Sequence, residues 1–489
     1  MQCWRHDAYP VSQPNEKVPN GSNEHTRAVG VAVTGDVVDG LVSMLGQGNV
    51  LVGDDVSARF DGWPPVSPVS ALCIVRPGTT AEVSAVLQYC DRARIAVVPQ
   101  GGRTGLAKGA RATPGDVALS LERLNRIEAI DVAGNTMTVE AGVPLQRVQE
   151  AAAEQGLFYP VDLGARGSAT IGGTIATNAG GNRVLRFGMT REQVLGVEAV
   201  LSDGTVVSSL NRLLKNNAGY DLKQLFIGSE GTLGVVTRAV LRLRPRLGRT
   251  ATALVAASRL EALLELLRRL SALARDSLTG FEVMWPEFID TVLSSGRHKD
   301  PFDTRHGFWA LIEIANSDAG SILESVIGAA LEDGLVSDAV VATSEAQAAA
   351  LWAIREDSQA RAAALQPAIH FDIGLPQSTM SAYVELVYDQ LRTRWPAAKL
   401  LVFGHVGDCN IHLTVGVGAT DPESRHAVEE MVYEPLRALG GTVSAEHGIG
   451  LEKRDFLSVT RNPAEIALMR RLKSALDPNQ TLNPGKILG

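Results

Sequence analysis

Three glycine-rich stretches in the first half of the chain constrain its fold and chemistry most. Residues 99–105 read PQGGRTG after an apolar run, 164–181 hold six glycines among small polar residues, and 227–234 read IGSEGTLG. Because glycine lacks a Cβ atom, its backbone N–H group can approach an anion closely. The first stretch alone is as typical of an ordinary tight turn as of an anion-binding loop. Three such stretches in one half of the chain indicate loops that bind a long ligand with phosphates and a planar ring.

Two common phosphate-binding motifs are absent from the sequence. No complete GxGxxG pattern occurs, and no GxxxxGK[ST] pattern occurs. A nicotinamide-dependent Rossmann enzyme and a P-loop nucleotidase are therefore disfavoured. The formal net charge of −8 also argues against a nucleic-acid partner or an anionic bilayer.

The cysteines and the hydropathy pattern bear on the compartment. Cys3, Cys73, Cys90 and Cys409 form no CxxC pair, which indicates reduced thiols and a cytoplasmic location. No apolar run reaches the length of about 18–20 residues that spans a bilayer. Residues 1–27 are polar and contain three prolines, so we expect a flexible tail without a secretory signal.

The pattern of apolar runs predicts an α+β fold, and a change of texture near 246–250 predicts two domains, at 28–247 and 248–489. In the first domain we expect strands at 71–75, 95–98, 116–121 and 136–140, helices at 80–93 and 143–155, and a hairpin from 194–201 to 205–207. In the second we expect an antiparallel sheet covered by helices, with strands at 308–315, 370–375, 400–403 and 442–445, helices at 259–275, 319–333, 344–365 and 377–394, and an extended end at 476–488.

Three histidines and a glutamate near the C-terminus predict a metal site. His405 and His412 flank a predicted turn, so a hairpin would place them opposite each other, and Glu446 follows the last predicted strand. Two imidazoles and a carboxylate can hold a divalent metal with positions open for substrate. His447 would point away from Glu446 and be available as a general base. The alternative is that these histidines are half-buried and hydrogen-bonded to loop carbonyls. We interpret Cys409 as a small turn residue.

Long motifs in this chain resemble a known family. YPVDLGARGS at 159–168, NAGG at 178–181 and NAGYDLKQLFIGSEGTLG at 217–234 resemble the FAD-linked D-2-hydroxyacid dehydrogenases, which include the D-2-hydroxyglutarate and D-lactate enzymes of the vanillyl-alcohol-oxidase superfamily. The resemblance runs from about residue 70 to the C-terminus.

The family resemblance implies a PCMH-type FAD-binding domain of two subdomains and a C-terminal cap domain. The absence of histidine between His25 and His298 favours non-covalent FAD. The resemblance implies that FAD is bound by Gln100, Gly101, Gly102, Arg103, Thr104, Gly105, Asp162, Leu163, Gly164, Ser168, Ile171, Gly172, Gly173, Asn178, Gly180, Gly181, Glu230, Gly234, Val235 and Asn483.

The same resemblance implies the catalytic residues. His405, His412 and Glu446 would bind zinc or a similar metal, His447 would act as the base, and Arg355 would bind the substrate carboxylate. From the residues alone, Arg355 is better explained as a surface charge paired with Glu356 or Gln359.

Some positions depart from the family pattern. His370 stands where lysine is common, Gln359 where Thr or Ser is common, and Thr414 where Asn is common. His370 and Gln359 are nevertheless expected to contact the substrate. Because these positions bear on the end of the substrate remote from the hydroxyl, the departures leave the identity of the acid undetermined.

The function implied is oxidation of a D-2-hydroxy acid to the 2-oxo acid by hydride transfer to flavin N5. The alternatives are a non-redox flavin-dependent transferase, an alcohol or aldonolactone oxidase, and a partner subunit without activity of its own. An electron-transferring flavoprotein, a quinone or a cytochrome would accept the electrons, and electron transfer to a membrane-bound acceptor would place the protein at the membrane surface. The sequence is also compatible with a homodimer.

Overall fold

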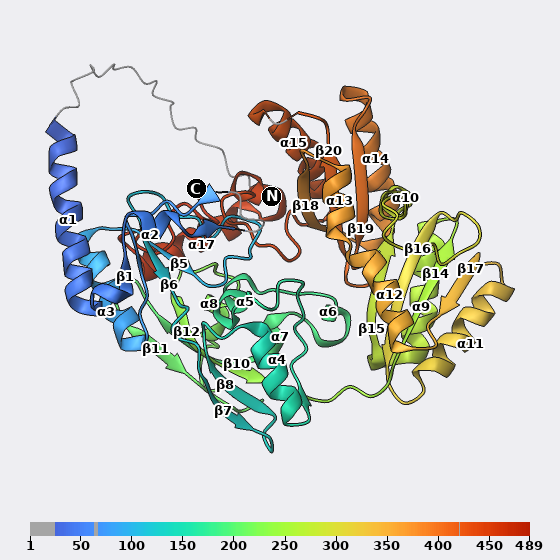
Figure 1. The fold of residues 1–489 in the computed structure, drawn as a ribbon, viewed down its shortest axis with the longest axis horizontal. Helices are drawn as coiled ribbons and strands as arrows, with labels where there is room; N and C mark the ends of the chain where they lie inside the picture. Colours follow the sequence, from blue (N-terminus) through green and yellow to red (C-terminus); the bar gives the residue numbers. More distant parts are fainter. Residues whose placement is uncertain (1–24, 63–66, 420) are drawn as a thin grey trace, which may run out of the picture.

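The computed structural model describes residues 25–62, 67–419 and 421–489. Most of the predicted tail, 1–27, lies outside this range, and its last three residues begin helix α1. Figure 1 shows two bodies side by side, one from the first half of the chain and one from the second. Among the described residues, no helix combines the length and apolar character needed to cross a membrane.

The two larger sheets of the first half share one hydrophobic core. A four-stranded sheet has the order β1-β4-β6-β5, and a five-stranded antiparallel sheet has the order β11-β10-β12-β8-β7. The predicted strands and the predicted hairpin, β10–β11, are confirmed. The bounds are β1 Val50–Leu51, β4 Cys73–Val75, β5 Val97–Gln100, β6 Val117–Ser120, β7 Ile127–Asp131, β8 Thr136–Glu140, β10 Val194–Val200, β11 Val206–Ser209 and β12 Val235–Arg242, with helices α1 His25–Leu45, α3 Thr80–Ala93, α4 Leu145–Glu154 and α5 Ile171–Thr177.

Helix α3 illustrates how local sequence builds this half. Val83, Val86 and Leu87 recur at helical spacing and are fully buried in the shared core. The side chain that caps the helix is Thr79, whose hydroxyl accepts the N–H of Glu82.

The second half contains a seven-stranded antiparallel sheet with helices on both faces, as predicted. Its order is β17-β14-β16-β15-β19-β20-β18. Helices α9, α11, α14 and α15 pack on one face, and α10, α12 and α13 pack on part of the other. The bounds are β14 Thr250–Ala257, β15 Leu278–Met284, β16 Phe308–Ala315, β17 Asp338–Val341, β18 Ile369–Gly374, β19 Lys399–Gly404 and β20 Asn410–Gly416, with α9 Leu260–Ala274, α10 Pro286–Ser294, α11 Ala319–Glu332, α12 Glu345–Glu356, α13 Ser358–Ala364, α14 Met380–Arg394 and α15 Pro422–Leu439.

Two predicted elements of this half were wrong. The helix at 344–365 is divided into α12 and α13 because Asp357 leaves helical geometry and its carboxylate caps α13 at Ala360 N–H. The segment 442–445 is not a strand, because only Thr442 pairs, in an isolated bridge to Gly374.

The C-terminal segment returns to the first half. Helix α17, Pro463–Leu476, contacts the first half, where Lys473 Nζ donates to the carbonyl of Thr232 at 2.9 Å and Ser202 Oγ donates to the carbonyl of Leu476 at 3.0 Å.

The predicted extended end at 476–488 is wrong, because the residues after α17 form turns with positive φ angles at Gln480, Asn483 and Ile487. The Asp477 carboxylate accepts the N–H groups of Thr481 and Leu482 and so bends the chain locally. Leu482 nevertheless forms a parallel bridge with Val97 at the edge of the four-stranded sheet.

Candidate active site

Polar side chains line one face of the large sheet where helices leave it uncovered. His412 on β20 lies opposite Phe403 on β19 and opposite Asp372 on β18. Glu282 on β15 shares this face, because it lies two residues before Met284, the partner of Phe403. Antiparallel register therefore collects groups that are far apart in sequence.

The predicted metal-binding residues lie together. His405, His412 and Glu446 each offer one ligand atom, and these atoms all lie within 4.8 Å of one another. The prediction that His405 and His412 lie opposite each other on neighbouring strands is wrong, because His405 lies beyond the end of β19 and Phe403 is the partner of His412. Their ring centres are nevertheless 5.3 Å apart. This donor set fits a zinc-like cation.

Glu282 is a central residue that the sequence did not reveal. Its carboxylate is buried and accepts a hydrogen bond from Nδ1 of His405 at 2.5 Å and one from Nε of Arg355 at 2.8 Å. Burial would raise the pKa of Glu282, but the charges of His405 and Arg355 outweigh it and lower the pKa to about 2. Glu282 therefore supports one metal-ligand candidate and one substrate-binding candidate.

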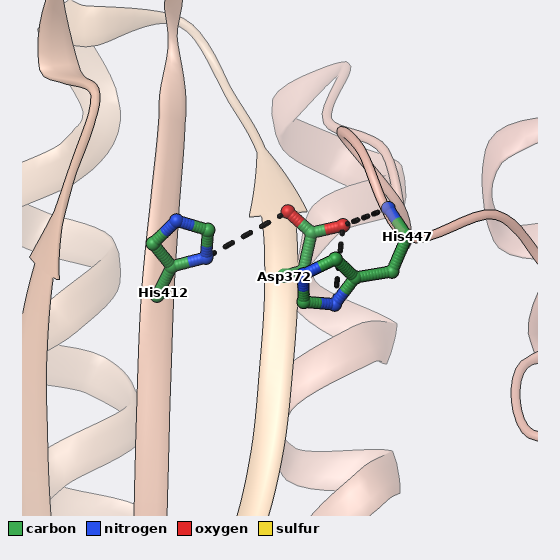
Figure 2. A group of neighbouring side chains, drawn as sticks. All are labelled: Asp372, His412 and His447. Carbon is green, nitrogen blue, oxygen red and sulfur yellow. Dashed lines mark hydrogen bonds and ion pairs between the residues drawn. The ribbon is translucent and has the colours of Figure 1, made fainter. Parts of the chain in front are cut away.

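Asp372 organises the loop that carries Glu446 and His447. Its Oδ2 accepts the backbone N–H of Glu446 at 2.9 Å and that of His447 at 2.8 Å, and its Oδ1 accepts from Asn410 Nδ2 at 2.9 Å. Figure 2 shows this carboxylate between the rings of His412 and His447. These three residues form a second group that could hold a metal. Because both oxygens of Asp372 already accept protein hydrogen bonds, we interpret it as a support.

Glu446 and His447 face different spaces, as predicted. His447 lines a cavity of about 660 Å³, and Glu446 lines a cavity of about 410 Å³. Nδ1 of His447 lies 3.8 Å from Asp372 Oδ2. Buried Lys453, which also lies 3.6 Å from Asp372 Oδ2, lines the larger cavity with His447.

Arg355 is buried on α12 and paired with Glu282, so the surface-charge interpretation of Arg355 is wrong. His370 lines the larger cavity, and its Nδ1 lies 3.2 Å from the hydroxyl of Thr414. Gln359 is exposed on α13 and lies outside the linings of both cavities.

The larger cavity lies where the predicted cofactor loops meet. Eight predicted residues line it: Gly101, Gly102, Arg103, Thr104, Gly105, Leu163, Gly173 and Glu230. Near it, and among the described residues, the buried atoms Gln100 Oε1, Thr170 Oγ1 and Asn483 Oδ1 have no hydrogen-bond partner. A glycine-lined cavity with unpaired polar atoms fits a large polar cofactor.

Other predicted cofactor residues lie outside that lining, and several have structural contacts. Asp162 forms ion pairs with Arg166 and Arg183, and a Cβ atom on Gly172 would lie 2.7 Å from the Cβ of Ala141. The residues outside the lining are Gln100, Asp162, Gly164, Ser168, Ile171, Gly172, Asn178, Gly180, Gly181, Gly234, Val235 and Asn483, of which Asn178 lines the smaller cavity.

Four hydrogen bonds join the glycine loops to the second half. Oε1 of Glu446 accepts the N–H of Gly181 at 2.7 Å. The carboxylate of half-buried Glu230 accepts the N–H groups of Ile449 and Gly450 at 2.7 and 2.8 Å, and Asn483 Nδ2 donates to the Glu230 carbonyl at 2.8 Å. The metal-ligand candidate Glu446 therefore touches the second glycine loop.

Comparison with known proteins agrees with this arrangement. Residues 71–209 match the family model described as FAD binding domain, and 248–487 match that of FAD linked oxidases, C-terminal domain. The chain is 41% identical over 432 residues to a D-2-hydroxyglutarate dehydrogenase of Xanthomonas citri pv. viticola, covering 87% of this chain and 90% of that one.

Two further comparisons extend this result. The mitochondrial D-2-hydroxyglutarate dehydrogenase of Bos taurus is 38% identical, covering 86% of this chain and 77% of that one. The structure of 4-ethylphenol oxidase from Gulosibacter chungangensis superposes with a TM-score of 0.73 at 18% identity, covering 96% of this chain and 98% of that one. At that identity the likeness concerns the fold.

Proposed function

Because this chain belongs to the FAD-dependent D-2-hydroxyglutarate dehydrogenase family, we propose that it oxidises a D-2-hydroxy acid of the D-2-hydroxyglutarate class to the 2-oxo acid. The observation that carries the proposal is the position of His447, which lines the glycine-loop cavity beside His412 and Asp372. The relatives support this dehydrogenase function over the transferase and aldonolactone oxidase alternatives.

The proposed roles follow from the side chains. FAD, when bound, supplies the acceptor for the hydrogen and electron pair that leave the α-carbon. A divalent cation, zinc in our proposal, would be held by His405, His412 and Glu446, and would lower the pKa of the substrate hydroxyl. Arg355, held by Glu282, orients the substrate carboxylate.

His447 is the proposed general base. Its Nδ1 lies beside Asp372, so Nε2 is the nitrogen available to accept the hydroxyl proton. The negative charge of Asp372 stabilises the imidazolium that forms. The backbone bonds from Asp372 hold Glu446 and His447 in one fixed arrangement, which keeps the base beside the metal-ligand candidate.

The remaining parts of the proposal extend from the sequence. We assign residues 28–247 and 248–489 as the two domains, supported by their separate sheets. An electron-transferring flavoprotein, quinone or cytochrome as acceptor, a homodimer and a cytoplasmic location complete the proposal.

The test is anaerobic flavin reduction by a panel of D- and L-2-hydroxy acids, with metal analysis of the same sample. We expect D-2-hydroxyglutarate to bleach the flavin and its L-enantiomer to leave the flavin oxidised. A flavin that no hydroxy acid reduces would contradict the proposal and favour a transferase or an inactive partner subunit. Reduction by aldonolactones in a metal-free protein would favour the oxidase.

A further inference from the structure

Arg361 on α13 is a half-buried cation without an anionic partner at hydrogen-bond distance among the described residues. Its Nε is buried and makes no hydrogen bond. The nearest acid that raises its pKa is Asp357, but that carboxylate already binds Arg297 Nε at 2.9 Å, His298 Nε2 at 2.8 Å and the N–H of Ala360.

Arg361 lies within the candidate active site. Its guanidinium carbon is 4.3 Å from the ring centre of Phe403, and that of Arg355 is 4.8 Å from the same ring centre. The Phe403 ring is in turn 5.1 Å from the ring of His412. Two guanidinium groups therefore surround one aromatic ring beside a metal-ligand candidate.

The two arginines differ in how their charges are balanced. Arg355 pairs with Glu282, which also binds His405. The guanidinium of Arg361 instead lies over the rings of Phe403 and Phe288, the latter at 5.7 Å. Burial, together with the charge of Arg355, lowers the pKa of Arg361 to about 10. A desolvated guanidinium that keeps its charge is costly unless an anion binds it.

We propose that Arg361 binds a second anionic group of the substrate, at the end remote from the hydroxyl, and thereby selects 2-hydroxy dicarboxylates over monocarboxylates. This inference rests on the proposed function. Arg361 is a specificity-determining residue, since a planar guanidinium can bind a carboxylate through two parallel hydrogen bonds. Burial, then the charges of Arg361, His447 and Arg425, lower the pKa of His370, which lines the larger cavity.

The test compares substrates that differ only in the second carboxylate. In wild-type protein, kcat/KM is measured for D-2-hydroxyglutarate and for D-2-hydroxypentanoate. Arg361→Gln should lower kcat/KM for the dicarboxylate about 10- to 100-fold, mainly by raising KM. It should leave kcat/KM for the monocarboxylate within about twofold of the wild-type value. Arg361→Lys should recover part of the loss. The control is Arg392→Gln, because Arg392 also stacks on an aromatic ring, Tyr388, but is exposed on α14.

A binding measurement separates this inference from the proposed chemistry. Calorimetry with 2-oxoglutarate and 2-oxopentanoate reports recognition whether or not the flavin is reduced. We expect Arg361→Gln to weaken the binding of 2-oxoglutarate and to leave the binding of 2-oxopentanoate unchanged. Equal losses for both ligands, or unchanged 2-oxoglutarate binding in a variant that melts like wild type, would overturn the inference. If Arg361→Gln fails to fold, Arg361→Met is the second neutral variant, and an unchanged preference of Arg361→Met for 2-oxoglutarate over 2-oxopentanoate would overturn the inference.

Discussion

Oε1 of Glu282 lies 2.5 Å from Nδ1 of His405, and both side chains are buried. The hydrogen bond leaves Nε2 of His405 as the nitrogen that faces Glu446, at 4.0 Å. A carboxylate that binds the second nitrogen of a histidine is a common support for a metal ligand. The same carboxylate binds Arg355, so one buried acid connects the metal-site candidate with the substrate-site candidate.

Glu282→Gln should weaken metal binding about 10- to 100-fold, because the neutral amide orients His405 less strongly. Metal content after dialysis against a series of chelator concentrations measures the effect. Glu287→Gln is the matched control, since Glu287 is exposed on the neighbouring helix α10. Equal metal retention in Glu282→Gln and wild type would show that this contact is purely structural.

His447→Ala should reduce the rate of flavin reduction by about 10²–10⁴-fold, because the hydroxyl proton loses its acceptor. The flavin content should stay unchanged. Stopped-flow absorbance under anaerobic conditions measures both quantities. His426→Ala is the control, because His426 is an exposed histidine on α15. A rate near that of wild type would remove His447 from the role of base.

Gly102→Ala should lower flavin occupancy, because a Cβ atom there would lie 1.8 Å from the carbonyl oxygen of Ser168. The loop would have to move out of its cofactor-binding position. Gly105→Ala in the same loop is the control, since its Cβ would meet nothing within 4 Å. The ratio of flavin to protein absorbance measures occupancy. Full occupancy in Gly102→Ala would show that this loop tolerates a shift without contacting the cofactor.

Two buried thiols should make stability fall at alkaline pH. Burial raises the pKa of Cys73 and of Cys90 from 9.0 to about 12. The unfolded chain therefore loses these protons first, so their contribution is complete below the unfolded pKa and is lost as pH rises toward 12. Above pH 9 we expect a decline in unfolding free energy of about 1.4 kcal/mol per pH unit for each thiol.

Urea unfolding at pH 7, 9 and 10.5 measures this decline. A Cys73→Ala, Cys90→Ala double variant should be less stable at pH 7, because packing is lost, but its stability should fall less steeply with pH. In the native protein, alkylation should label exposed Cys409 and reach the two buried thiols only after unfolding. Identical pH slopes in both proteins would contradict the expectation.

The sequence by itself determined the element pattern and the types of chemistry. Glycine spacing indicated the cofactor loops, and apolar periodicity indicated the strands and helices, because these are local properties of the chain. The helix predicted at 344–365 was wrong because a single capping residue, Asp357, competes with helix continuation. His405, His412 and Glu446 could be predicted as metal ligands because imidazole and carboxylate groups beside predicted strand ends are typical of metal sites.

Only the tertiary structure decided which supporting groups meet these residues. Glu282 lies 123 positions from His405 in sequence, and Asp372 lies 75 positions from His447, so no local pattern links them. Strand register brings each carboxylate to the site face of the sheet, where neighbouring cationic side chains outweigh burial and keep the pKa of each carboxylate low. The tertiary structure also distinguishes Arg355, which pairs with Glu282, from Arg361, whose buried Nε makes no hydrogen bond.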